Sequence, residues 1–190
     1  MPIVINGDGT ISGISAGGLP AGTVTSATLA TGVGGKILQV KQAVQSDNST
    51  ETTSSNVWED ISGLSVSITP SSSSNKILVS YKVCFTGKES AYMTVCRIVR
   101  DSTAIGIGDQ SGSNRARATT YESSGAWTYF VGQHNNMFLD SPNTTSATTY
   151  KLQFMSSSGE TLYVNRSIHF PDTEHFGTQI SSITVMEVAV

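Results

Sequence analysis

The sequence predicts an all-β protein, a jelly-roll-like sandwich preceded by an N-terminal arm, and three observations lead to this prediction. Charged residues make up only 13% of the chain, against roughly 25% in an average protein. Serine, threonine and glycine replace them, which disfavours helices and suits strands joined by polar turns. Apolar residues alternate with polar ones, most regularly at Ile77, Val79, Tyr81, Val83 and Phe85, as expected of a half-buried strand.

Further apolar segments recur at short intervals and are separated by Gly, Ser, Asn and Pro turns, as in sandwiches and jelly rolls. We expect strands over 38–44, 64–68, 77–85, 92–99, 127–131, 137–139, 150–155, 162–164 and 180–190. A turn at 87–90 would join two of them, 77–85 and 92–99, in one hairpin.

The last predicted strand is apolar on both faces. Ile183 and Val185 point one way, whereas Met186, Val188 and Val190 point the other way. A strand of this kind is buried on both faces. Because a two-layer sandwich covers only one face, we expect a neighbouring subunit to cover the second.

Two regions are expected, an anchor arm with a glycine-rich linker at 1–36 and the sandwich, or head, at 37–190. The turn dipeptides Asn6-Gly7 and Asp8-Gly9 predict a small β-hairpin in the arm, and 25–30 could form one helical turn. A lone hairpin is marginally stable in water. Its apolar residues therefore need a partner surface, and the predicted anchor residues are Ile3, Ile5, Ile11 and Ile14.

The two cysteines, Cys84 and Cys96, are expected to be free thiols. In the predicted hairpin they would be several residues out of register, too far apart for a disulfide. Free thiols fit synthesis in a reducing compartment.

Charge and hydropathy exclude several partner classes. The net charge of −3 lacks the basic excess of a nucleic-acid-binding protein. No apolar run reaches the roughly 20 residues of a membrane span, and the first residues lack the features of a signal peptide. We therefore expect neither nucleic-acid binding nor membrane insertion.

Motifs that could carry catalysis are incomplete. The GDQSG sequence at 108–112 approaches the GDSG stretch of chymotrypsin-like proteases, but Gln110 interrupts it. The GVGGK sequence at 32–36 has Ala30 and Ile37 where a phosphate-binding loop needs Gly and Ser or Thr. Residues 6–10 have too few acidic ligands for calcium. We therefore expect no enzyme, no catalytic residue, no cofactor and no metal.

Two minor alternatives stay open. His169 and His175 are not at a common zinc-ligand spacing, although histidines of several subunits could meet on a symmetry axis. A glycosidase needs two carboxyl groups about 5–9 Å apart, and the sequence cannot place the candidates relative to one another: Glu59, Asp60, Glu122, Asp140, Asp172 and Glu174.

The chain resembles phage virion proteins of the tail-fibre type, particularly those of marine phages. The resemblance begins with VINGDGTISGI, GGLPAGTV and GVGGKILQV and continues at 64–70, 100–106, 138–142 and 182–188. It implies a homotrimer assembled in the host cytoplasm and mounted on the virion by an N-terminal anchor. The short separation between arm and head leaves a short fibre, a tail-tip or adaptor piece and a capsid decoration protein as alternatives.

Two functions follow from this resemblance. The first is attachment to a host-surface receptor, in which aromatic rings stack on sugars and arginines meet phosphate or carboxylate groups. The candidate contacts lie on three loops: Lys88 and Tyr92; Arg115, Arg117 and Tyr121; and Arg166, His169, Phe170, His175 and Phe176. The second function is purely structural, a capsid decoration or connector protein whose arm adds a strand to another virion protein. In the alternative interpretation of the loop residues, Trp127 and Tyr129 are core residues and the arginines lie along a solvated strand.

Overall fold

The computed structural model describes residues 4–5, 11–12, 36–87, 93–122, 129–159 and 161–190, and these residues contain no helix. The chain divides into two compact units, Met1–Lys36 and Ile37–Val190. In the first unit β1 (Val4–Ile5) pairs antiparallel with β2 (Ile11–Ser12). The predicted hairpin is therefore confirmed, whereas the helical turn at 25–30 lies outside the described residues.

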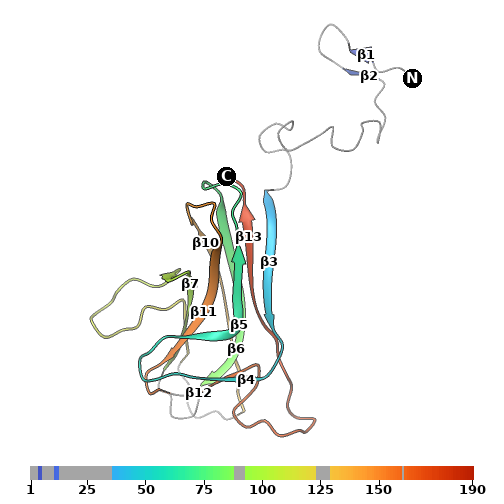
Figure 1. The fold of residues 1–190 in the computed structure, drawn as a ribbon. Helices are drawn as coiled ribbons and strands as arrows, with labels where there is room; N and C mark the ends of the chain where they lie inside the picture. Colours follow the sequence, from blue (N-terminus) through green and yellow to red (C-terminus); the bar gives the residue numbers. More distant parts are fainter. Residues whose placement is uncertain (1–3, 6–10, 13–35, 88–92, 123–128, 160) are drawn as a thin grey trace. The chain divides into compact units, whose positions relative to one another are not determined.

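The second unit is an all-β sandwich of two antiparallel sheets (Figure 1). The first sheet, here the β6 sheet, contains β3 (Ile37–Gln45), β4 (Ser49–Thr52), β6 (Lys76–Gly87), β10 (Gly132–Asp140), β12 (Thr161–Val164) and β13 (Ser181–Val188). The second sheet, here the β11 sheet, contains β5 (Glu59–Ile68), β7 (Thr94–Arg100), β8 (Thr103–Ile105), β9 (Thr120–Glu122) and β11 (Thr148–Ser156).

Strand β6 organises its sheet. Its residues 77–82 pair with β10 and with β13 at once, so these two strands flank it. Strand β3 pairs with the edge of β13 that faces away from β6. Strand β12 pairs with residues 85–87 of β6, on the same edge of β6 as β13, and also pairs with β4. In the other sheet β11 lies between β5 and β7, and β8 and β9 pair with β7.

Consecutive long strands alternate between the two sheets, which is the jelly-roll-like connectivity that the sequence predicts. The predicted hairpin between 77–85 and 92–99 is wrong for this reason, because β6 and β7 lie in opposite sheets. Cys84 is opposite Gln133 and Cys96 is opposite Phe154. Both cysteines are nevertheless free and buried, as expected.

The core lies between the sheets and follows the predicted alternation. Alternate residues along β6, β11 and β13 are buried, whereas the alternation in β5 shifts by one residue between Ile61 and Leu64. The largest enclosed side chains include Phe85, Tyr150, Phe154 and Ile183. Burying one such apolar side chain contributes roughly 1.5–3 kcal/mol. The regular strand periodicity therefore accounts for most of the stabilising apolar contacts.

Two parts of the strand prediction differ from the structure. The strands β4, β8 and β9 were not predicted, because they are short and β4 (STET) has no apolar residue to show alternation. The segment 127–131 was predicted as a strand, but its described residues Tyr129, Phe130 and Val131 precede β10 and belong to no strand. Tyr129 and Phe130 are both exposed, so no buried face holds this segment in a sheet.

A buried polar cluster joins the sheets. Asp140, at the end of β10, accepts hydrogen bonds from Arg100 at 2.8 and 2.9 Å and from the Tyr150 hydroxyl at 2.7 Å. Burial, and then the hydrogen bond to Asp140, raise the pKa of Tyr150 above its usual range. The hydroxyl therefore stays protonated and donates, and the carboxylate is shared between strands of both sheets.

A second buried carboxylate closes the end of the β6 sheet. Glu187 is fully buried and accepts from Asn75 and Gln39 at 2.6 Å each, and from the Ser71 amide and hydroxyl at 2.7 Å each. Burial disfavours its charge, but these donors outweigh burial and lower the pKa of Glu187 to about 2. Neutral donors alone thus hold an ionised carboxylate in the interior.

Candidate binding surfaces on the loops

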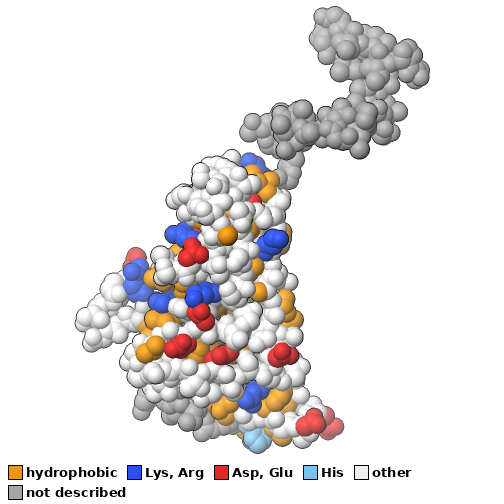
Figure 2. All heavy atoms as spheres, in the orientation of Figure 1, with side chains coloured by type: hydrophobic (Ala, Val, Ile, Leu, Met, Phe, Trp, Pro, Cys, Tyr) orange, Lys and Arg blue, Asp and Glu red, His pale blue; other side chains and the backbone are white. Residues whose placement is uncertain are grey.

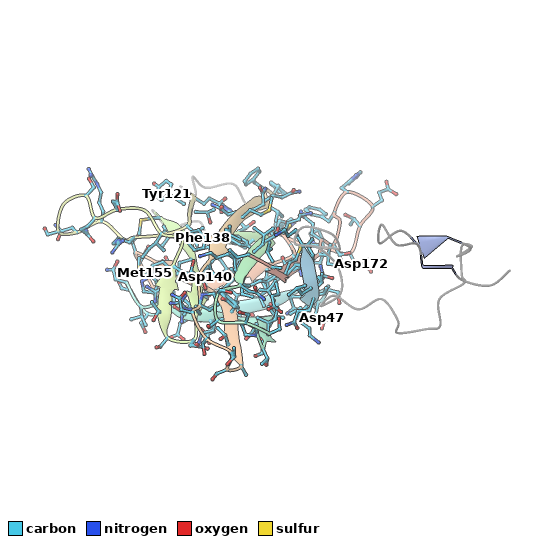
Figure 3. All side chains as sticks on the ribbon, turned by 90° about the horizontal axis from the view of Figure 1, so that it is seen from above. Asp47, Tyr121, Phe138, Asp140, Met155 and Asp172 are labelled. Atoms are coloured by element: carbon cyan, nitrogen blue, oxygen red, sulfur yellow. The ribbon has the colours of Figure 1, made fainter. Side chains whose placement is uncertain are left out.

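The predicted receptor contacts fall into two regions of the head. Tyr121 belongs to the first region and Asp172 to the loop that forms the second, and the two residues lie far apart (Figure 3). Lys88, Tyr92 and Trp127 lie outside the described residues. The anchor residues Ile3 and Ile14 also lie outside them, while Ile5 and Ile11 are opposite each other in the hairpin.

The second region contains a group of contacting rings, here called the aromatic cluster and made of Tyr129, His169, Phe170 and Phe176. The ring centroids of Tyr129, His169 and Phe176 lie 5.4, 5.7 and 6.0 Å apart, and Phe170 lies 6.5 Å from Phe176. Tyr129 is 70% exposed, so it is not the core residue of the alternative interpretation. The cluster thus presents aromatic surface to solvent.

Asn165 holds the loop that carries most of this cluster. It is buried, has a φ of 61°, and donates from its side chain to the carbonyls of Gln45 and Asp47 at 2.8 and 3.0 Å. Its side-chain oxygen accepts from the Ser181 hydroxyl at 2.7 Å. Its backbone carbonyl accepts from the Gln179 amide at 3.1 Å. Both ends of the loop are therefore tied to the β6 sheet through one residue.

Arg166 extends the cluster on one side. Its guanidinium lies 4.8 Å from the centre of the Tyr163 ring and 5.8 Å from that of Phe170, within the range of cation–π attraction. A pocket of about 250 Å³ lies beside the rings and is lined in part by Tyr129, His175 and Phe176. Enclosed sites for small ligands measure roughly 300–1,000 Å³. This pocket is therefore smaller than an enclosed small-molecule site.

The first region is a pocket of about 530 Å³ between β7, β9 and the preceding loop. Met93, Val95 and Tyr121 supply apolar lining, and Arg115 and Arg117 supply charge. Arg115 donates to the Ser111 hydroxyl at 2.8 Å, and Arg117 donates to the Gly108 carbonyl at 2.8 Å. No carboxylate of the described chain forms an ion pair with either arginine. Their charge is therefore available to a phosphate or carboxylate group.

The structure places the residues considered for catalysis in other roles. The Ser111 hydroxyl of GDQSG accepts from Arg115. Asp60 bonds Lys151 at 2.7 Å, and Glu122 lies 3.0 Å from His134. Burial raises the pKa of Asp60, but hydrogen bonds from Lys151 and Gln153 outweigh it, and the net pKa is lowered. The contact between Asp60 and Lys151 is an ordinary ion pair, and the other two contacts are hydrogen bonds.

The described residues form neither a metal-ligand cluster nor a membrane-spanning helix. Within the described ranges, no three His, Cys, Asp or Glu side chains gather as metal ligands would. His169 packs in the aromatic cluster, and His175 lines the adjacent pocket. The described part of the chain forms no helix of the length and hydropathy that a bilayer crossing requires.

Sequence reasoning missed two contributors to this surface. The sequence predicts a strand at Tyr129 and does not single out Asn165. The adjacent aromatics Tyr129 and Phe130 were a usable signal, because a strand that buries one face cannot bury both of two neighbouring residues. The role of Asn165 had no such signal, since its partners are distant in sequence.

Comparisons with known proteins give a limited likeness. No protein-family model and no curated protein matches the sequence. Among solved structures, the Gt strain of infectious bursal disease virus matches with 14% identity over 80% of this chain and 38% of that chain, at a TM-score of 0.42. The VP2 subviral particle of the same virus matches with 12% identity over 79% of this chain and 41% of that chain, at 0.41. This chain thus spans less than half of those proteins, and such scores are too low to transfer a function.

Proposed function

We propose that this chain is a non-enzymatic phage virion protein, a short tail-fibre-like module that attaches the particle to a host-surface glycan. The N-terminal arm binds another virion protein, and the head carries the receptor contacts. The observation that carries the proposal is the aromatic cluster, in which exposed rings from two distant segments meet on anchored loops.

The physical case rests on how sugars are recognised. Aromatic rings combine a large apolar face with polar edges, and the C–H faces of a sugar ring can stack on such a face. Binding residues are disproportionately found on loops held by a rigid scaffold. The cluster meets both conditions, because Asn165 fixes its loop to the β6 sheet.

Trimerisation would strengthen weak individual contacts. In the homotrimer that the sequence resemblance implies, three heads engage one surface, and linked sites raise overall avidity by a factor of about 10²–10⁴ without a new contact. A pocket that holds one sugar unit would then suffice for firm attachment.

The test compares particles that carry variants of this protein. Tyr129→Ala with Phe176→Ala removes two rings of the cluster, and Tyr121→Ala removes a tyrosine of similar exposure, 60% against 70%, in the other region. We expect normal incorporation for both and a sharp fall in adsorption to host cells only for the first. A fall only for Tyr121→Ala would move the receptor contact to the arginine pocket.

The same particles distinguish the structural alternative. If the cluster variant adsorbs normally while its particles become fragile to heat or salt, the protein is a decoration or connector protein and the attachment proposal fails. The purified full-length protein on a panel of neutral and acidic polysaccharides provides a second readout, in which the cluster variant should lose binding.

A further inference from the structure

The outer face of the β6 sheet carries an apolar row that crosses four strands. Val40 of β3 is opposite Met186 of β13, Met186 is opposite Leu78 of β6, and Leu78 is opposite Leu139 of β10. Directly paired residues point to the same side of a sheet. This side is the outer one, because the neighbours Val79 and Val185 point into the core.

Further apolar side chains widen this row. Leu38 and Val188 lie on one side of it and Met137 on the other. Met137 is 64% exposed, and Val40 and Leu139 are 53% exposed each. We call the seven residues the outer β6 patch: Leu38, Val40, Leu78, Met137, Leu139, Met186 and Val188.

The corresponding face of the β11 sheet is different. Lys151 and Gln153 both bond Asp60 at 2.7 Å, Arg97 bonds Gln153 at 2.7 and 3.0 Å, and Ser67 bonds Thr149 at 2.8 Å. Figure 2 shows basic and acidic side chains interspersed over the middle of the face in view, and hydrophobic ones along the margin where β3 runs. The outer face of the β11 sheet is thus formed by polar groups that hydrogen-bond to one another, whereas the outer β6 patch is apolar.

The patch is a continuous apolar surface across four strands. The largest apolar patch on a monomer measures about 300–600 Å² and is often functional, whereas a standard interface buries roughly 800 Å² per partner. Seven half-exposed or partly buried apolar side chains gather on these four strands. The remaining outward positions, such as Gln42, Thr184 and Ser80, would form a polar rim.

We propose that the outer β6 patch is the interface through which copies of this chain associate. Charge favours a second copy, because the outward positions of the paired segments of β3, β13, β6 and β10 hold two charged residues, Lys76 and Lys82, and otherwise only uncharged side chains. A surface that is nearly uncharged selects no partner of opposite sign, and interfaces between identical chains are the more apolar class.

The position of the patch supports the same occupant. It lies at the end of the sheet where β3 begins at Ile37, directly after the N-terminal unit. If a cyclic symmetry axis passes this end of the sheet, the N-terminal arms of all copies begin close together, as attachment at one point requires. Cyclic closure is the commonest symmetry of soluble oligomers.

The test measures the mass of the full-length protein by light scattering after gel filtration. Val40→Lys with Met137→Lys charges the patch, and Ser67→Lys places one charge on the outer face of the other sheet as the control. We expect a multiple of 20.0 kDa for the wild type and the control, and 20.0 kDa for the double variant with unchanged circular dichroism. A monomeric wild type, or a double variant of wild-type mass, overturns the proposal.

A second measurement covers the case in which the charged variant does not fold. The variants Met137→Cys and Ser67→Cys are each treated with a charged maleimide. The native cysteines do not interfere, because both are buried. Slow labelling of Met137→Cys in an oligomer supports the interface, and equal rates in the two variants overturn it. Slow labelling in a monomer would show that another part of the same chain covers the patch, which also overturns it. Because no measurement uses a host cell or a glycan, this outcome is independent of the attachment test.

Discussion

The Asn75 side chain donates a hydrogen bond to Glu187 at 2.6 Å, which ties the turn before β6 to the end of β13. Three further donors converge on the same carboxylate. Because every partner donates to the carboxyl oxygens, the arrangement requires an ionised carboxylate in the folded protein, and this leads to the first prediction.

Glu187→Gln should destabilise the protein by about 2–3 kcal/mol, because the side-chain NH2 of glutamine would face buried hydrogen-bond donors instead of accepting from them. The pKa of Glu187 is about 2 in the folded protein and 4.5 in the reference state. A lowered pKa stabilises the fold above pH 4.5, and this stability is lost as the pH falls toward 2. Urea unfolding between pH 7 and 3 should show a steeper loss for the wild type than for Glu187→Gln. Parallel pH profiles would contradict this account.

The Asp140 cluster predicts two losses of different size. Tyr150→Phe removes one neutral donor and should cost about 1–2 kcal/mol. Asp140→Asn leaves Arg100 without its anion in a partly buried position and should cost more, about 3 kcal/mol. Chemical unfolding of both variants measures the two losses in free energy of unfolding, and a larger loss for Tyr150→Phe would refute the prediction.

Asn165→Ala should release the loop of the aromatic cluster. It removes three side-chain hydrogen bonds and puts a less suitable residue at a positive φ, at an expected cost of about 2–3 kcal/mol. Limited proteolysis should cut the variant within 166–178 faster than the wild type. Asn165→Gly tolerates the backbone conformation and serves as the control, so it should lose the hydrogen bonds without the added strain.

The two thiols should be unreactive in the native protein. Burial raises the pKa of Cys96 to about 12, against a smaller opposing effect of the Arg97 amide, and burial also raises the pKa of Cys84. Because the thiolate is the reactive species, Ellman's reagent at pH 8 should react with neither cysteine until denaturant is added. Rapid reaction of one thiol in the folded protein would place it at the surface.

The fold was more predictable than the site, for physical reasons. The alternation in β6 reflects one buried face, and this is a local property of the sequence. The partner of each strand is not local, and the proximity of 77–85 and 92–99 in the chain wrongly indicated a hairpin. Strands at the margins, such as β4, bury too little to show a pattern.

The candidate site shows the same division. Arg166, His169, Phe170 and Phe176 were predicted as loop residues because they are aromatic or charged and follow a strand. Their contact with Tyr129 depends on two polar anchors. Asn165 ties the segment 165–179 to the β6 sheet, and the Thr86 hydroxyl of β6 donates to the Phe130 carbonyl. Polar anchors of this kind have no periodicity, so the sequence alone did not reveal the cluster.

The place of β13 between β3 and β6 has a consequence for synthesis. The first and the central strand of the β6 sheet do not pair with each other, and both pair with a strand that the ribosome makes last of the three. The sheet therefore cannot close before residues 181–188 have emerged, and until then the aliphatic side chains of β3 and β6 remain without their partners. Folding that depends on such distant pairing is slow and exposed to aggregation. We therefore expect a nascent chain stalled before residue 181 to be bound by chaperones rather than partly folded.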